Sequence, residues 1–214
     1  VQNTPIAFPF AHHTMHITGT KAYSELFSLP YKRLPGFQHI ERNDVVVFNY
    51  PVETCRPVDK RENYIKRAVG VPGDIVEMHN GNLVINGRPG YDSNDVQKAY
   101  IVYTDGSGLN EKVLIDKRME YYPQYDENGN VIYILFVTKD EIAEVEKWGN
   151  VTKVEMFGNT NAAFPKSELY NWDFHNFGPL TVPSKGDVIE LNDFTLPLYE
   201  TLITIYEGNT LEKR

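Results

Sequence analysis

The dipeptide Asn80-Gly81 is the strongest local constraint on the fold of this chain. It lies between two short apolar runs, Asp74–His79 and Asn82–Asn86, and a two-residue Asn-Gly loop favours a type I′ turn between antiparallel strands. Further upstream, the valine-rich run Asp44–Asn49 is typical of a buried strand. Asn63–Gly70 follows it and mixes apolar with basic residues. Residues 37–90 are therefore predicted to be β, and the chain as a whole to be mainly β.

The centre of the chain has a different pattern, in which a helix is expected between two strands. Val131–Val137 is predicted to be a strand, and Val151–Phe157 another. Between them, Thr138-Lys-Asp-Glu141 is a capping-box pattern, so we expect a helix that runs to Trp148 and stops at Gly149-Asn150. These signals predict a small α+β module inserted in the β fold. We expect three divisions. Residues 1–90 form a core β region, residues 91–176 form the inserted module, and residues 177–214 return to the core.

The two ends of the chain carry weaker signals. Residues 1–36 contain four prolines and look irregular, with one short helix expected at Lys21–Phe27 after Thr20 as a cap. Near the other end, Lys185–Asn192 is expected to form a strand. Pro197–Tyr206 is expected to form a short helix, with proline in its first turn and Gly208 just past its end.

Composition excludes several classes of function. The 214 residues include 21 Lys and Arg against 29 Asp and Glu, a net charge of −8, and such a chain does not attract nucleic acid or anionic lipid. The single cysteine, Cys55, excludes an internal disulfide and a cysteine-rich zinc site. No phosphate-binding loop or G-x-S-x-G elbow occurs, and no cofactor is expected.

No stretch of the sequence is suited to crossing a membrane. The longest apolar run has seven residues, Val131–Val137, against the roughly 20 that a membrane-spanning helix needs. No signal peptide is apparent at the start. The chain opens at Val1 rather than Met, so we expect either a processed protein or an excised piece of a longer one.

The histidines give a weak metal signal. His12 and His16 have the i, i+4 spacing of a helical metal site, with His13 between them. Nearby Pro9 and the lack of a carboxylate before Glu25 favour a polar loop instead. His39, His79 and His175 are isolated and are expected to be structural, and no metal site is predicted.

The most informative segment is Tyr64-Ile-Lys-Arg-Ala-Val-Gly-Val-Pro-Gly-Asp74, which carries Lys66. Most lysines in strands are exposed. A lysine on a covered face loses water, however, and a fall in pKa from about 10.4 to about 8 costs about 3 kcal/mol and makes the neutral amine available as a base. Such a lysine can activate a serine nucleophile.

This segment resembles the lysine box of bacterial type I signal peptidases, which are Ser–Lys proteases. Arg42–Pro51 is similar to the strand box that precedes it in this family, Pro57–Asn63 joins the two, and the hairpin over residues 75–89 fits the family layout. The resemblance covers residues 38–90 and implies a signal-peptidase-like β fold. Residues 91–176 correspond to the variable insertion of longer members.

The resemblance implies roles for individual residues. Lys66 matches the general base. Tyr64, Ile65 and Val47 match positions that line pockets for small substrate side chains, and Asn63 stands where the family often has Asp. The strand around Lys66 is expected to pair with an extended signal peptide and to border an apolar groove, with Tyr64 on the same face as Lys66.

The family's Ser-Met-x-Pro box and its Gly-Asp-Asn box do not occur in this sequence. We expect the former to lie before Val1 and the latter after Arg214, so that this fragment would be inactive alone. The implied partners are signal peptides of preproteins and, through a segment absent from this chain, the cytoplasmic membrane, with the catalytic domain on its outer side.

Three alternatives remain open. One is a non-catalytic relative that binds peptides or proteins, and another is a β-rich domain whose boxes match by chance. The third is a self-cleaving Ser–Lys repressor, which the long insert and the lack of a DNA-binding segment disfavour.

Overall fold

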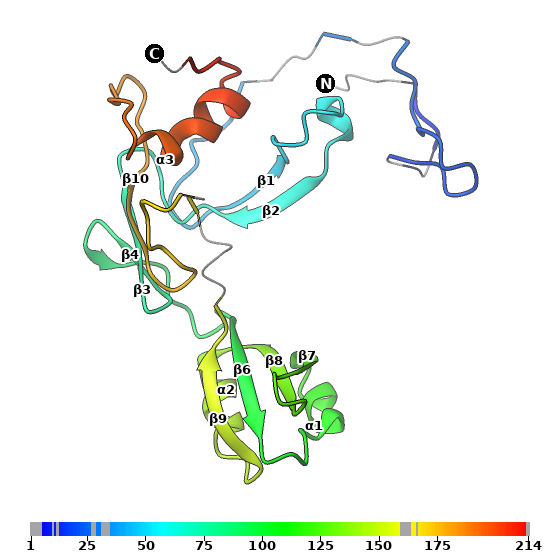
Figure 1. The fold of residues 1–214 in the computed structure, drawn as a ribbon. Helices are drawn as coiled ribbons and strands as arrows, with labels where there is room; N and C mark the ends of the chain where they lie inside the picture. Colours follow the sequence, from blue (N-terminus) through cyan, green and yellow to red (C-terminus); the bar gives the residue numbers. More distant parts are fainter. Residues whose placement is uncertain are drawn as a thin grey trace. The chain divides into compact units, whose positions relative to one another are not determined.

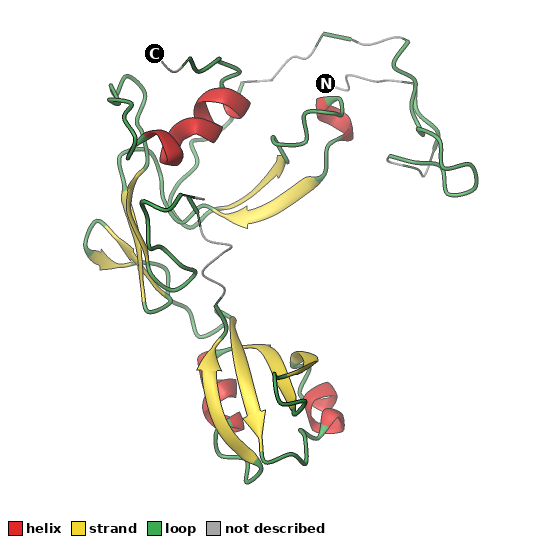
Figure 2. Cartoon of the chain, in the orientation of Figure 1, coloured by secondary structure: helices red, strands yellow, loops and turns green. Residues whose placement is uncertain are grey.

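The computed structural model describes residues 6–9, 11, 13–26, 29–30, 35–158, 164–165 and 167–212. The chain divides into two compact units, the first formed by Val1–Asp74 with Val182–Arg214 and the second by Ile75–Thr181. Figure 1 labels strands and helices of both units. Antiparallel strands are the main regular structure, as Figure 2 shows. The predicted mainly β class is therefore confirmed.

The first unit contains one pair of strands and a helical segment. Strand β1 (Val45–Asn49) pairs with β2 (Asn63–Arg67), and the 3-10 turn η1 (Val58–Lys60) lies in the connection between them. Near the end of the chain, α3 (Leu196–Thr201) continues into the π-helical η3 (Leu202–Tyr206). This confirms the predicted C-terminal helix. Gly208 follows it with a φ of +70°, a conformation that favours glycine.

The second unit begins with the predicted hairpin. Strands β3 (Ile75–His79) and β4 (Asn82–Ile85) flank Asn80 and Gly81, whose φ angles of +49° and +71° are those of a type I′ turn. β5 (Arg88–Pro89) and β10 (Phe177–Thr181) complete a sheet with the strand order β10-β3-β4-β5. The hairpin prediction is confirmed.

The same unit contains an α+β module, as predicted. Its sheet has the order β7-β8-β6-β9, formed by β6 (Lys98–Thr104), β7 (Glu120–Tyr125), β8 (Val131–Val137) and β9 (Val151–Met156). Helices α1 (Glu111–Asp116) and α2 (Lys139–Val145) pack against it. The sheet and the helices share one buried core, which contains Val102, Leu109, Leu114, Met119, Tyr133, Leu135, Val137, Ile142 and Val145.

The capping box at the start of α2 forms as predicted. The Glu141 amide donates to the Thr138 hydroxyl, while the Thr138 amide donates to the Glu141 carboxylate at 2.7 Å. The helix ends at Val145, three residues earlier than expected. From there to Trp148 the chain continues as turns, in which the Lys147 and Trp148 amides donate to carbonyls three residues back.

The helix predicted at Lys21–Phe27 is wrong over the described residues 21–26, and Phe27 lies outside the described residues. Instead, Thr14 bridges Lys21, and Ala7 bridges Tyr23. The Ala22 and Ser24 amides donate to carbonyls of residues 13 and 6. A helix does not form because these backbone groups pair with a neighbouring segment.

The strand expected at Lys185–Asn192 is also wrong. A turn occupies Lys185–Gly186, closed by the Ser184 amide donating to the Asp187 carboxylate at 2.7 Å. The residues that follow have no ladder partner in the described chain, and the Val188 residue is 97% exposed. An apolar run predicts a strand only where a second strand is available to satisfy its amides and carbonyls.

Replacing Leu135 by Ala should destabilise the second unit by about 2–5 kcal/mol, since Leu135 is fully buried in the shared core. The free energy of unfolding, measured with urea, checks this. Val188→Ala is the matched control, because its exposed side chain should change the value by no more than about 0.5 kcal/mol. Equal effects of the two substitutions would contradict the assigned core.

Gly81→Ala and Gly87→Ala form a second matched pair. Both glycines have a φ of +71°, so both variants acquire the same left-handed strain. A Cβ at Gly81 would overlap the terminal methyl of Met156, whereas nothing lies within 4 Å of a Cβ at Gly87. Gly81→Ala should therefore lower the urea midpoint more. A larger effect at Gly87 would contradict the packing of the turn.

Candidate functional site

The paired strands β1 and β2 bring the predicted site residues together. Their register places Val46 opposite Lys66, Val47 opposite Ile65 and Phe48 opposite Tyr64. Opposed residues share a face, and successive residues alternate between faces. Lys66 and Tyr64 therefore lie on one face of this two-stranded ribbon, as expected. Val47, Ile65 and Asn63 lie on the other.

Aromatic rings organise the face that carries Lys66. The Tyr64 ring stacks on that of Tyr50, with centroids 4.6 Å apart and planes 8° apart, and lies 6.3 Å from the Phe48 ring. The Lys66 Nζ lies 5.8 Å from the centroid of the Tyr64 ring. This geometry is that of a cation–π contact between the Lys66 ammonium and the Tyr64 ring.

The expected covering of Lys66 is not present in this chain. Lys66 is exposed, as are Val45 and Val47, so the valine-rich strand is not the buried strand that its composition predicts. The physical reason is that a ribbon of two strands has only its own side chains to exclude water, and in the described residues no third strand extends it.

The opposite face exposes two apolar side chains beside each other. Val47 is 65% exposed and Ile65 is 64% exposed, and they are direct cross-strand partners. At the end of the ribbon, the Asn49 side-chain amide donates to the Asn63 side-chain oxygen at 3.0 Å. This face offers apolar contact area with a polar pair at its end.

An ion pair with a buried carboxylate joins the two ends of the site segment. The Arg42 guanidinium donates to both carboxylate oxygens of Asp74, at 3.0 and 2.7 Å. These hydrogen bonds raise the pKa of Arg42 above its usual range. Two parallel N–H···O bonds give the pair a fixed geometry. Neither residue was assigned a role from the sequence, although opposite charges at the two ends of the matched boxes were the available signal.

The connection between β1 and β2 is ordered by its own arginines and acids. Arg61 donates to the carbonyl oxygens of Arg56 and Pro51, and the Glu62 amide donates to the Glu53 carboxylate at 2.9 Å. Arg56 forms an ion pair with Glu53. These contacts define the path of the segment that delivers the chain from one strand to the other.

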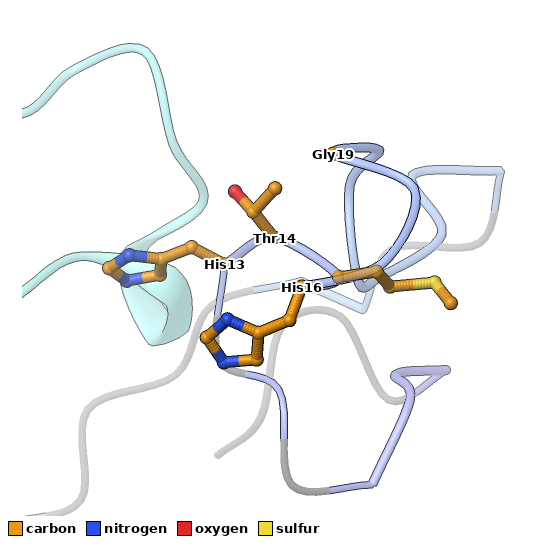
Figure 3. A pocket seen from close by; sticks show the side chains of 5 residues that line it. His13, Thr14, His16 and Gly19 are labelled. Carbon is orange, nitrogen blue, oxygen red and sulfur yellow. The ribbon is translucent and has the colours of Figure 1, made fainter.

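A hollow of about 520 Å³ lies at the histidine segment and is lined by His13, Thr14, Met15, His16 and Gly19. Figure 3 shows the two imidazole side chains leaving the chain in different directions. His13 Nδ1 lies 3.1 Å from the Arg56 guanidinium, which can only donate, so this nitrogen is the acceptor. His12 lies outside the described residues. In the described part of the chain, no three His, Cys, Asp or Glu side chains are grouped to hold a metal ion.

In the described residues, no helix combines the length and the apolar character needed to cross a bilayer.

Comparisons with known proteins agree on one family. The model of the family "Signal peptidase, peptidase S26" matches residues 10–140, which include both strands of the ribbon. Signal peptidase IB of Staphylococcus aureus is 26% identical over 146 residues, covering 65% of this chain and 67% of the relative. Signal peptidase I P of Bacillus subtilis subsp. natto is 42% identical over 48 residues, 22% of each chain. No solved structure matches.

The family model covers more than half of the 214 residues, and the matched segment contains Lys66 and the Arg42–Asp74 ion pair. The sequence resemblance and the family model therefore lead to the same assignment. The chain belongs to the signal peptidase family, peptidase S26.

Proposed function

We propose that this chain is part of a peptidase that removes signal peptides from secreted preproteins, with Lys66 as the general base of a Ser–Lys mechanism. The observation that supports this most is the setting of Lys66. It lies on β2, within the segment that matches the family, and the outer edge of β2 has no partner strand in the described residues. The base thus lies beside an edge that can accept an extended peptide.

The proposed reaction requires a serine from a segment outside this chain. The neutral Lys66 amine takes the proton of the serine hydroxyl as the oxygen attacks the carbonyl carbon that follows a small residue. The peptide bond breaks, the Lys66 ammonium gives its proton to the leaving amine, and an acyl-enzyme remains. Neutral Lys66 then takes a proton from the water whose oxygen attacks the acyl carbon, and returns that proton to the serine oxygen as the acyl group leaves.

The free edge of β2 is the proposed binding site for the substrate. An extended signal peptide would add a strand there, with its main chain hydrogen-bonded to β2. Its side chains would alternate between the two faces of the ribbon. Substrate side chains on one face would contact Ile65 and Val47, and those on the other face would contact Tyr64. Asn63 would contact the peptide near the end of the strand.

In this proposal, Lys66 becomes shielded from water only when the complete active site is formed. In this chain Lys66 is exposed, so the low-water environment that favours its neutral form would be completed by the serine-bearing segment and the bound peptide. The same proposal places the protein at the cytoplasmic membrane through a further segment, with this domain on the outer side. The family to which the chain belongs supports this placement.

A non-catalytic peptide-binding role is the second candidate. It is favoured by one observation, that the Lys66 ammonium lies against the Tyr64 ring of its own strand. Both roles use the edge of β2 and the apolar face. They differ in whether Lys66 is needed for cleavage.

Lys66→Met in the full-length peptidase should lower preprotein cleavage by about 10⁴-fold, because the base is lost while side-chain volume is nearly kept. The rate of release of the signal peptide is the measurement. Lys153→Met is the matched control, since Lys153 is also a strand lysine whose Nζ lies over a tyrosine ring, 5.4 Å from the Tyr103 centroid. Near-normal cleavage by the Lys66 variant would remove Lys66 from the mechanism.

Ile65→Asp should weaken binding of an extended peptide with alanine at alternate positions by about tenfold or more, because a carboxylate replaces apolar contact area. Calorimetric titration of the peptide into the protein measures this. Val188→Asp is the control, since that exposed valine lies outside the ribbon. Equal losses in both variants would place the peptide elsewhere or make the effect one of net charge.

A further inference from the structure

The Arg42–Asp74 ion pair differs from the other ion pairs of the described chain in the burial of its carboxylate. The Asp74 side chain is only 6% exposed, whereas the acidic partners of the other pairs are 16–49% exposed. A carboxylate removed from water in this way needs a cation and hydrogen bonds to satisfy it. Loss of the Arg42 contact should therefore cost more free energy at Asp74 than loss of a basic partner costs at an exposed carboxylate.

Asp74 holds the turn through which the chain leaves the lysine strand. Its carboxylate accepts a hydrogen bond from the Val71 amide at 2.9 Å, and its own amide donates to the Val71 carbonyl at 3.0 Å. Gly73 adopts a φ of +91° inside this turn. The carbonyl of Asp74 accepts from the Val182 amide. Side chain and backbone of Asp74 together fix the end of the segment that begins with β2.

Arg42 lies just before β1, at the end of the ribbon that is formed by the start of β1 and the end of β2. The next residue, Asn43, donates its amide to the Ala68 carbonyl at 2.7 Å, and the Ala68 amide donates to the Asp44 carbonyl at 2.8 Å. The Arg67 side chain also donates to the Asn43 carbonyl. The ion pair therefore joins Asp74, six residues after Ala68, to Arg42, which precedes the start of β1.

The consequence concerns register. A ribbon of two strands is marginally stable by itself, and a slip of one residue moves every side chain to the other face relative to its partner strand. Lys66 is opposite Val46 only in the observed register. A fixed, bidentate contact just beyond the last strand pair restricts the ribbon to that register, because a slipped strand would separate the guanidinium from the carboxylate.

We propose that Arg42 and Asp74 are positioning residues for Lys66, acting through the register of the ribbon. This inference rests on the proposed function, in which Lys66 is the general base. The ion pair touches neither substrate nor the reacting atoms. It determines the face on which the amine lies and the direction in which the lysine strand continues.

The test uses Arg42→Gln, Arg42→Lys and Asp74→Asn in the full-length peptidase. Arg42→Gln and Asp74→Asn should lower kcat by about 100-fold, the scale expected for a displaced catalytic group, with KM changed by less than about threefold. Arg42→Lys should recover part of kcat, because it restores the charge without the planar fork. Lys117→Gln is the control, since it breaks the exposed Lys117–Glu144 pair, and it should leave kcat unchanged.

A second measurement separates positioning from general loss of stability. Cross-strand contacts between Val46 and Lys66, measured by nuclear magnetic resonance in the full-length protein, should disappear in Arg42→Gln, while the signals of the α+β module persist. Wild-type kcat, or unchanged Val46–Lys66 contacts, in Arg42→Gln and Asp74→Asn would overturn the inference. So would global unfolding of both variants together with full activity of Arg42→Lys, because the pair would then act only on stability.

The proposed function is tested separately by Lys66→Met. If that variant is inactive and the ion-pair variants keep full kcat, the positioning role fails and the general base remains. If Lys66→Met cleaves at the normal rate, the general base fails, and with it any need to position this amine.

Discussion

The ion pair between Arg42 and the buried carboxylate of Asp74 is the interaction on which the proposed site depends. The site itself is a ribbon of two short strands, and such a ribbon does not generate a core of its own. Its order comes from contacts at its ends, where the bidentate pair joins the start of β1 to the turn after β2. At the other end, the Tyr50–Tyr64 ring stack and the Asn49–Asn63 hydrogen bond do the same.

The α+β module and the ribbon differ in how far they bury their apolar side chains. The α+β module in Ile75–Thr181 encloses a continuous core between one sheet face and two helices, with Leu114, Leu135 and Val145 fully buried. The ribbon leaves Val47, Ile65 and Lys66 exposed. Exposed apolar side chains and a lysine on an edge strand are suited to contact with a further chain, which agrees with the proposed binding of a signal peptide to this edge.

Local signals in the sequence predicted the elements that local interactions hold. The Asn80-Gly81 turn formed because both residues readily adopt the positive φ angles that it requires, and α2 began after Thr138 because its cap is made within four residues. The strand expected after Lys185 and the helix expected at Lys21 did not form, because their amides needed partners that the local sequence does not reveal. Strands β6, β7 and β10 and helix α1 were not predicted individually, since these elements depend on packing against distant parts of the chain.

The sequence alone determined the family of this protein, the mainly β class and the identity of the lysine strand, because these reside in contiguous motifs and in short-range backbone preferences. The tertiary structure decided which residues face each other across the ribbon, that Lys66 shares a face with Tyr64, and that Arg42 meets Asp74 across 32 positions of sequence. It also decided that the valine-rich strand is open to water. Burial and ion pairing depend on what the rest of the chain places nearby, and no local pattern contains that information.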